Sequence, residues 1–418
     1  MSSINLQRYL FYPFVLFMFL SMIFCGVSRV NILFHITLAL FIITMIINSE
    51  TRTRFINDRD FLPALGMTGA FLLYFSLSNL WAESSHLSSA ISHSFYLFIF
   101  LCLYRQCELQ ERKKYIIGAA YLGIVAYLFI FLCLYRQCEL QERKKYIIGA
   151  AYLGIVALTI LTLVYVNKEH IFQNRLERAF PFSPDNVIDL GGYMALGILL
   201  SAILVRETRN YWFYIPVPLL LVCLILTQSR GPFLSMIVAA IVAFLCKPKW
   251  NFKLLAGSLI VLLVIGSILY FSGFFDIFIK RAEESSRAGS VRFGIWQHAF
   301  EVAKQKMIFG WGFNKELEFI NGYGQPVTTT HSLYLATFLK GGVVGLLLLL
   351  SMILFAGRQC LRHLAANHKA EIAVIVFALM FYVTQGMFVI SNPREYWVLF
   401  WLPLAIIFST PVKTALQK

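Results

Sequence analysis

The chain has 418 residues, of which 59% are hydrophobic, 16% aromatic and only 14% charged. This mixture excludes an ordinary soluble domain, and hydrophobic runs of membrane-spanning length recur from end to end. The formal net charge is +15, but the Lys and Arg residues stand in short loops between hydrophobic runs, where positive charge holds a loop on the cytoplasmic side. We therefore assign most of the charge to membrane topology and expect no nucleic-acid partner.

The first hydrophobic run, Tyr9 to Val27, has no small-residue cleavage site and is followed at once by a second run. We expect a retained helix rather than a cleaved signal. Residues 96–126 then recur without a change as residues 127–157. Natural repeats diverge because each copy meets different neighbours, so perfect identity indicates a recent tandem duplication or a fault in the sequence record.

The spans predict an all-α polytopic membrane protein with about 12 transmembrane helices, or about 13 if the duplicated segment also spans. In the 12-helix arrangement the basic loops share one side with the C-terminus, and we expect the extra copy to have no part in the mechanism. These loops contain Arg52, Arg54 and Arg59; Arg105, Arg112, Lys113 and Lys114; Arg206 and Arg209; Lys247, Lys249 and Lys253; and Arg358, Arg362 and Lys369. The prediction is one membrane domain over residues 1–418, with the other loops on the extracytoplasmic side.

One extracytoplasmic loop, residues 274–331, is much longer than the rest and polar. Within it, Ser290 to Lys306 has apolar residues at helical spacing, including Phe293, Trp296 and Phe300. This pattern predicts an amphipathic helix that rests on the bilayer surface or covers a cavity. Arg292 would lie one turn before Trp296, near the start of that helix.

The segment Thr227 to Pro232 joins two spans with almost no loop. Gly231 and Pro232 allow a tight reversal, and Arg230 stands at the end of a hydrophobic segment, where a cation is costly unless it meets an anion or water. We weigh a binding role for Arg230 evenly against a snorkelling side chain that marks the membrane boundary.

His331 ends the long loop and opens the next span. A neutral imidazole at the membrane edge could accept a proton from a sugar hydroxyl, although a lone His at a helix start is more often an interfacial or capping residue. Arg281 and Arg287, earlier in the loop, could contact an anionic substrate or anchor the loop at lipid headgroups. Of these two we retain Arg287 as a weaker binding candidate.

The sequence offers no metal or nucleotide motif. There is no HExxH pattern, no Walker A segment and no dinucleotide fingerprint, and the carboxylates of the long loop are dispersed. We predict a protein without a metal or a cofactor, with its cysteines reduced.

Three motifs together resemble the O-antigen ligase and O-antigen polymerase superfamily of bacterial envelope proteins. They are TQSRG at Thr227 to Gly231, SVRFGIWQHAFEVAKQKMIFGWGFN at Ser290 to Asn314, and THSLYLATFLKGGVVG at Thr330 to Gly345. The resemblance is strong over about the C-terminal half, and the N-terminal half matches by its pattern of spans only. It implies a membrane glycosyltransferase of the GT-C type in the bacterial inner membrane.

The resemblance also implies the substrates and the roles of the site residues. A ligase would transfer O-antigen glycan from undecaprenyl diphosphate to the lipid A-core oligosaccharide on the periplasmic face. His331 matches the family's proposed base, and Arg230 and Arg292 match the arginines taken to hold the diphosphate. The guanidinium group of arginine is planar and always charged, and its N–H donors match phosphate oxygens. Two arginines could therefore replace a metal ion in a single inverting displacement.

The chain departs from the family pattern in two respects. Ser332, Leu333 and Tyr334 follow the loop histidine where many members have Asn or a carboxylate, and the perfect repeat is foreign to the family. The alternatives to a ligase are an O-antigen polymerase or a protein O-oligosaccharyltransferase of the same superfamily. A third alternative is a polysaccharide transporter or flippase, for which Asp189, near the start of a span, is the main candidate residue.

Overall fold

A computed structural model of the protein describes residues 3–47, 61–82, 144–167, 174–246, 292–365 and 368–409, apart from residues 322, 323, 387 and 391–393. It also describes isolated positions between these ranges. Three described helices are long and apolar enough to cross a membrane: Lys145–Tyr165, Val187–Thr208 and Leu333–Leu364. Shorter apolar helices accompany them. This architecture agrees with a polytopic helical membrane protein, while the predicted total of spans depends on segments outside the described residues.

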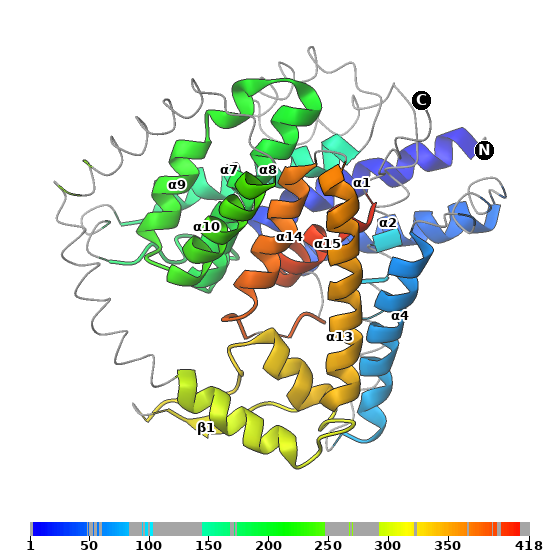
Figure 1. The fold of residues 1–418 in the computed structure, drawn as a ribbon. Helices are drawn as coiled ribbons and strands as arrows, with labels where there is room; N and C mark the ends of the chain where they lie inside the picture. Colours follow the sequence, from blue (N-terminus) through cyan, green and yellow to red (C-terminus); the bar gives the residue numbers. More distant parts are fainter. Residues whose placement is uncertain are drawn as a thin grey trace.

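The first half of the chain contributes the bundle shown in blue to green in Figure 1. Its helices are α1 (Ser3–Ile23), α2 (Ser28–Ile47), α4 (Leu62–Leu77), α7 (Lys144–Tyr165), α8 (Val187–Thr208), α9 (Val217–Leu226) and α10 (Arg230–Leu245). Short 3₁₀ turns follow α4 (η1, Ser78–Leu80) and α8 (η4, Tyr211–Tyr214). Asn186 caps α8 by accepting a hydrogen bond from the Ile188 amide, which supplies a partner to one of the unpaired amides at that helix start.

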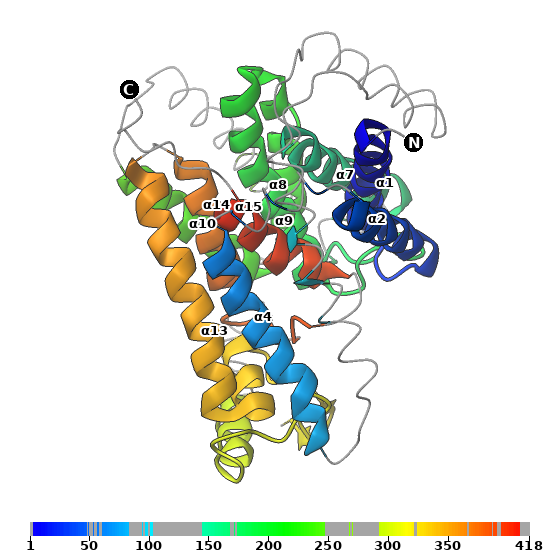
Figure 2. The ribbon, with the colours of Figure 1, turned by 90° about the vertical axis from the view of Figure 1, so that its right-hand side faces the viewer.

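The second half adds a helix over residues 292–304, the short antiparallel strands β1 (Phe319–Ile320) and β2 (Pro326–Val327), and α13 (Leu333–Ala365). It ends with α14 (Lys369–Phe381), the π-helical turn η5 (Trp397–Trp401) and α15 (Leu402–Ser409). Figure 2 shows α4 and α13 side by side. They extend beyond the rest of the bundle to the helix at residues 292–304 and the strand pair, which we call the cap (residues 292–331).

Close helix crossings form the bundle core. A Cβ added at Gly154 of α7 would lie 2.5 Å from the carbonyl oxygen of Phe19 in α1. A Cβ at Gly197 of α8 would lie 2.9 Å from Ile155 of α7. Gly154 and Ile155 belong to the second copy of the repeat, so the end of that copy is part of the packed core. Most of the first copy lies outside the described residues, and so does the predicted choice between 12 and 13 spans.

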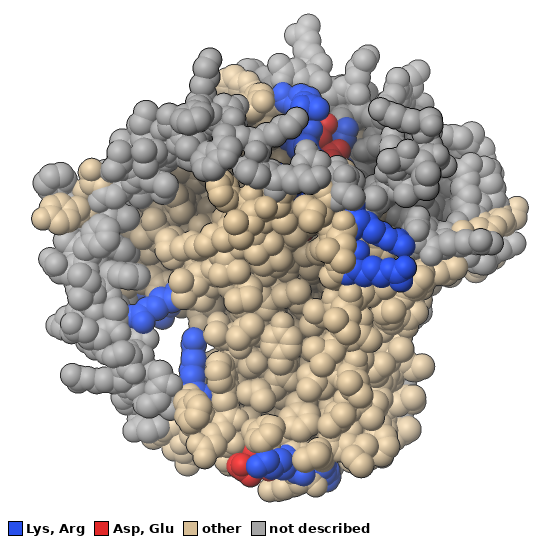
Figure 3. All heavy atoms as spheres, in the orientation of Figure 1, with Lys and Arg blue, Asp and Glu red and all other residues tan. Residues whose placement is uncertain are grey.

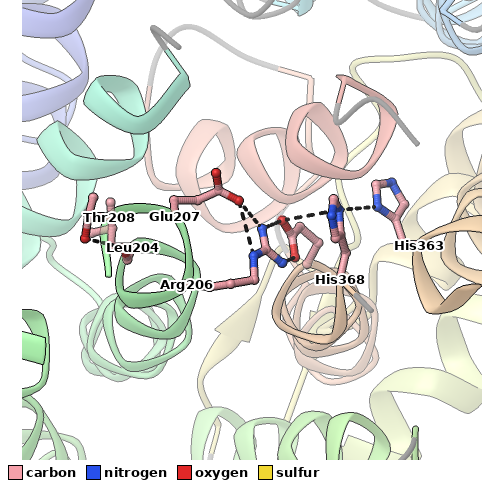
Figure 4. Close-up of polar contacts among 7 residues, drawn as sticks. Leu204, Arg206, Glu207, Thr208, His363 and His368 are labelled. Atoms are coloured by element: carbon pink, nitrogen blue, oxygen red, sulfur yellow. Dashed lines mark hydrogen bonds and ion pairs between the residues drawn. The ribbon is translucent and has the colours of Figure 1, made fainter. Parts of the chain in front are cut away.

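One end of the bundle carries a dense ion-pair network (Figure 4). The guanidinium of Arg206 in α8 forms ion pairs with Glu207 and with Glu371 of α14. The Nδ1 atoms of His363 and His368 lie 3.3 Å apart, and Nε2 of His363 donates to the carbonyl of Ile407 at 3.1 Å. The ends of α8, α13 and α15 therefore meet at the start of α14. The predicted membrane side of Arg206, Arg362 and Lys369 stays a prediction.

Uncharged atoms cover most of the described surface between the charged groups on the face drawn in Figure 3. A surface without charged groups is expected where side chains contact lipid, because a charge in the hydrocarbon core is costly.

Candidate functional site

His331 stands between the cap and α13 in an unusual backbone conformation. Its φ is 48°, in the left-handed region that costs a residue with a Cβ about 1 kcal/mol or more. Neighbouring bonds hold it there: the Thr330 hydroxyl donates to the Ser332 carbonyl at 2.7 Å, and the Leu333 amide donates to the Tyr382 carbonyl at 3.1 Å. The His331 side chain is half-buried. Strain of this kind is common at functional sites.

Arg292 lies in the first turn of the cap helix and acts on His331. Burial of the imidazole, and then the positive charge of Arg292, lower the pKa of His331 below its usual range. The ring is therefore neutral at pH 7 and can accept a proton. The predicted base and one predicted diphosphate ligand are thus close enough to interact.

The amphipathic helix predicted over Ser290 to Lys306 is confirmed as the helix at residues 292–304. Its small residues Ala299 and Ala303 are buried, and they belong to the same cluster as Phe338 and Leu339 of α13. Phe293 and Phe300, which the spacing placed on the apolar face, are 68% and 43% exposed. The buried face of this helix is therefore narrower than the apolar face that the sequence predicted, because α13 packs against its small side chains.

Arg230 is the first residue of α10, and the turn before it is also strained. Gln228 has a φ of 52°. A Cβ added at Gly231 would lie 3.1 Å from Oγ1 of Thr384, so the turn lies against the segment that follows α14. A Cβ added at Gly386 would lie 2.0 Å from the backbone nitrogen of His331. Thr384 and Gly386 are at most about 7 Å apart along the chain, so the segment brings the Arg230 turn and His331 near each other.

Arg175 supports this turn and was not predicted. Its Nε donates to the Thr227 carbonyl at 3.1 Å, and its Nη2 donates to the Ser229 hydroxyl at 3.0 Å. The half-buried guanidinium therefore fixes the backbone that precedes Arg230 and adds positive charge beside it. In the sequence, only its place in a short loop predicted to be extracytoplasmic could have drawn attention to it.

The third motif explains how the cap is held. Gly342 interrupts α13 with a φ of 61°. The backbone groups near this interruption form hydrogen bonds with the FGWG segment, residues 309–312. The amides of Trp311 and Gly312 donate to the carbonyls of Leu339 and Lys340 at 3.0 and 2.9 Å. A Cβ on Gly310 would lie 2.4 Å from the Lys340 carbonyl oxygen, so only glycine fits at that contact.

Lys340 strengthens the same junction. Its Nζ donates to the carbonyls of Phe313 and Lys315, both at 2.6 Å. The hydroxyl of Tyr74 in α4 lies 3.0 and 2.7 Å from the carbonyl oxygens of Phe309 and Gly341 and shares its one proton between them. These contacts fasten the cap to α4 and α13, and so they position Arg292 relative to His331.

Two other candidates have different outcomes. Arg287, the weaker predicted ligand of the diphosphate, lies outside the described residues. Asp189, the candidate of the transporter alternative, is buried in the first turn of α8 and accepts a hydrogen bond from Nε2 of Gln385 at 2.6 Å. Among the described residues, no group of three or more His, Cys, Asp or Glu side chains could hold a metal ion; the metal-free site stays a prediction.

Comparison with known proteins supports the resemblance seen in the motifs. Residues 215–350 match a family model described as O-antigen ligase, and this range contains Arg230, Arg292 and His331. A protein of Pseudomonas aeruginosa named O-antigen ligase is 24% identical over an alignment of 244 positions that covers 54% of this chain and 57% of that protein. The match thus spans little more than half the length of the relative. The C-terminal part of the chain is therefore similar to the O-antigen ligase family, in agreement with the three motifs.

Proposed function

We propose that the protein is a glycosyltransferase of the bacterial inner membrane that ligates O-antigen glycan from undecaprenyl diphosphate onto the lipid A-core oligosaccharide. The observation that carries the proposal is the interaction of the half-buried His331 with Arg292. The neutral imidazole of His331 can accept a proton from a hydroxyl group. The positive charge of Arg292 can stabilise a departing diphosphate.

The proposed reaction is a single displacement. His331 takes the proton of an acceptor hydroxyl while that oxygen attacks the anomeric carbon of the donor sugar. The bond between this carbon and the diphosphate oxygen breaks, and the negative charge collects on the diphosphate, where Arg230 and Arg292 stabilise it. Attack opposite the leaving group inverts the anomeric configuration and needs no metal ion.

The distribution of basic residues supports a candidate site on the periplasmic side of the membrane. The end of the bundle with Arg206, Arg362 and Lys369 is the cytoplasmic end by the positive-inside rule. Arg230 begins α10, and Cys246 follows its last residue just before the basic loop at Lys247. This arrangement supports a candidate site at the opposite, periplasmic end, where both lipid-linked substrates would be reached.

A strain that lacks its own ligase tests this function. It is complemented with the parent chain, with His331→Asn, and with the exposed-loop variant Gln325→Ala, at matched membrane levels. Asn tolerates a positive φ but is no base at pH 7. We expect high-molecular-weight lipopolysaccharide ladders from the parent and from Gln325→Ala, and none from His331→Asn.

A second strain separates the alternatives. If the parent leaves lipopolysaccharide rough in the ligase-deficient strain but restores ladders in a polymerase-deficient strain, the protein is a polymerase. If it restores only export of the lipid-linked glycan, it is a transporter or flippase.

A further inference from the structure

The segment after α14, residues 382–386, contacts both halves of the candidate site. On one side the Tyr382 carbonyl accepts from the Leu333 amide, and Gly386 lies directly against the backbone of His331. On the other side Thr384 lies against Gly231, the residue after Arg230. The position of this segment therefore sets the spacing between the proposed base and the Arg230 turn.

The Gln385 side chain ties the segment to α8. Its Nε2 donates to Oδ1 of Asp189 at 2.6 Å, and the two side chains are 2% exposed each. Gln385 lies between Thr384 and Gly386 in the chain, so this one bond holds the middle of the segment.

Asp189 is in turn fixed to the Arg230 turn. The Ser229 hydroxyl donates to the carbonyl of Val187 at 3.3 Å. A Cβ added at Gly191 would lie 3.0 Å from Oγ1 of Thr227. The start of α8 and the Arg230 turn thus form one unit, and Asp189 is the side chain through which that unit holds Gln385.

A buried carboxylate in a membrane protein is costly and commonly has a functional role. Here Asp189 does not face solvent, and its partner is a neutral amide that joins it to the residues beside His331. A small misplacement of a catalytic group can lower turnover by about 100-fold. A hydrogen bond that fixes the residues beside His331 would prevent such a misplacement.

We propose that the Asp189–Gln385 hydrogen bond is a positioning clasp that sets the spacing between His331 and Arg230. The proposal rests on the function proposed above, and it makes Asp189 and Gln385 positioning residues that do not touch the substrates. Loss of the clasp lets residues 384–386 relax, which misaligns the base while the groups that bind the diphosphate remain.

Purified variants test the clasp by the separation of kcat from KM. Asp189→Ala and Gln385→Ala should each lower kcat about 10- to 100-fold, within the range expected for misalignment, and change KM for the lipid-linked donor by less than about 3-fold. The double variant should match the single variants, because both remove the same bond. Asp189→Asn keeps an acceptor oxygen and should retain kcat within about 3-fold of the parent. Unchanged kcat, multiplying losses, or a rise in KM alone would overturn the clasp.

A cross-linking measurement does not depend on activity. The double variant Gly231→Cys and Thr384→Cys should form a disulfide readily when Gln385 is intact, because Thr384 lies next to the Cβ position of residue 231. With Gln385→Ala added, the cross-linking rate should fall at least about 10-fold as the spacing becomes variable. An equal rate overturns the clasp. Normal cross-linking that depends on Gln385, in a protein without any glycan transfer, would overturn the proposed function and leave the clasp in place.

Discussion

The two polar ends of the bundle use their cations in opposite ways. At one end, the Arg206 guanidinium is paired with two carboxylates, and Glu371 is completely buried beneath it. At the candidate site, no carboxylate pairs with Arg292 in the described part of the chain, and its charge acts on the neutral ring of His331. Neutralised charges hold helices together, whereas a charge without a counterion remains available for an anionic substrate.

The largest expected effect concerns the base. Replacement of His331 by Asn should lower the rate of glycan transfer about 10²- to 10⁴-fold, the usual contribution of a positioned acid or base. The melting temperature should not change, since Asn accepts the backbone conformation. Transfer assays and thermal unfolding of the purified protein measure the two quantities. A stable variant with the parent rate would show that His331 is not the base.

The ion pair between Arg206 and Glu371 should control stability instead of activity. Arg206→Met leaves the Glu371 carboxylate buried without its cation and should destabilise the protein by about 3–5 kcal/mol. Arg292→Met should change the free energy of unfolding by about 0.5 kcal/mol or less, as expected for an exposed residue, while abolishing most transfer. Denaturation in detergent distinguishes these outcomes, and equal losses of stability would contradict the proposed contrast.

The lysine of the cap junction should have an intermediate effect. Lys340→Met removes two hydrogen bonds from a charged donor and should destabilise the docked cap by about 2 kcal/mol. Limited proteolysis of residues 305–330 would detect the loosening. Lys304→Met is the control, since its ion pair with Glu301 is largely exposed and should contribute less than about 1 kcal/mol. Equal proteolysis of the two variants would show that Lys340 does not hold the cap.

The smallest effect is a shift in pH dependence. Arg292 lowers the pKa of His331, so its removal raises that pKa and protonates the base at a higher pH. The acid limb of kcat/KM should therefore move to higher pH in Arg292→Gln and stay in place in Arg292→Lys, which keeps the charge. A shift in neither variant would mean that Arg292 does not influence the base.

Local patterns in the sequence predicted the local parts of the fold. The cap helix followed from apolar spacing within 17 residues, Ser290 to Lys306. A tight turn near Arg230 was also predicted, but Gly231 and Pro232 lie in the first turn of α10, and Gln228 adopts the positive φ of the reversal instead. Each depends on interactions between near neighbours, which the sequence contains directly.

The contacts that organise the site could not be predicted in the same way. Asp189 and Gln385 are 196 positions apart, and nothing near either residue indicates the other. Arg175 holds a turn 52 positions away. The interruption of α13 at Gly342 becomes meaningful only when the FGWG segment is seen against it. These features depend on tertiary packing, which brings together residues without any periodic signal.

Transfer by the purified protein tests the central claim most directly. Undecaprenyl-diphosphate-linked glycan and a lipid A-core acceptor are incubated with the parent or with His331→Asn, in the presence of a metal chelator. We predict a glycosylated acceptor of inverted anomeric configuration with the parent and none with the variant. A product of retained configuration, or equal product from the two proteins, would contradict a metal-free displacement with His331 as the base.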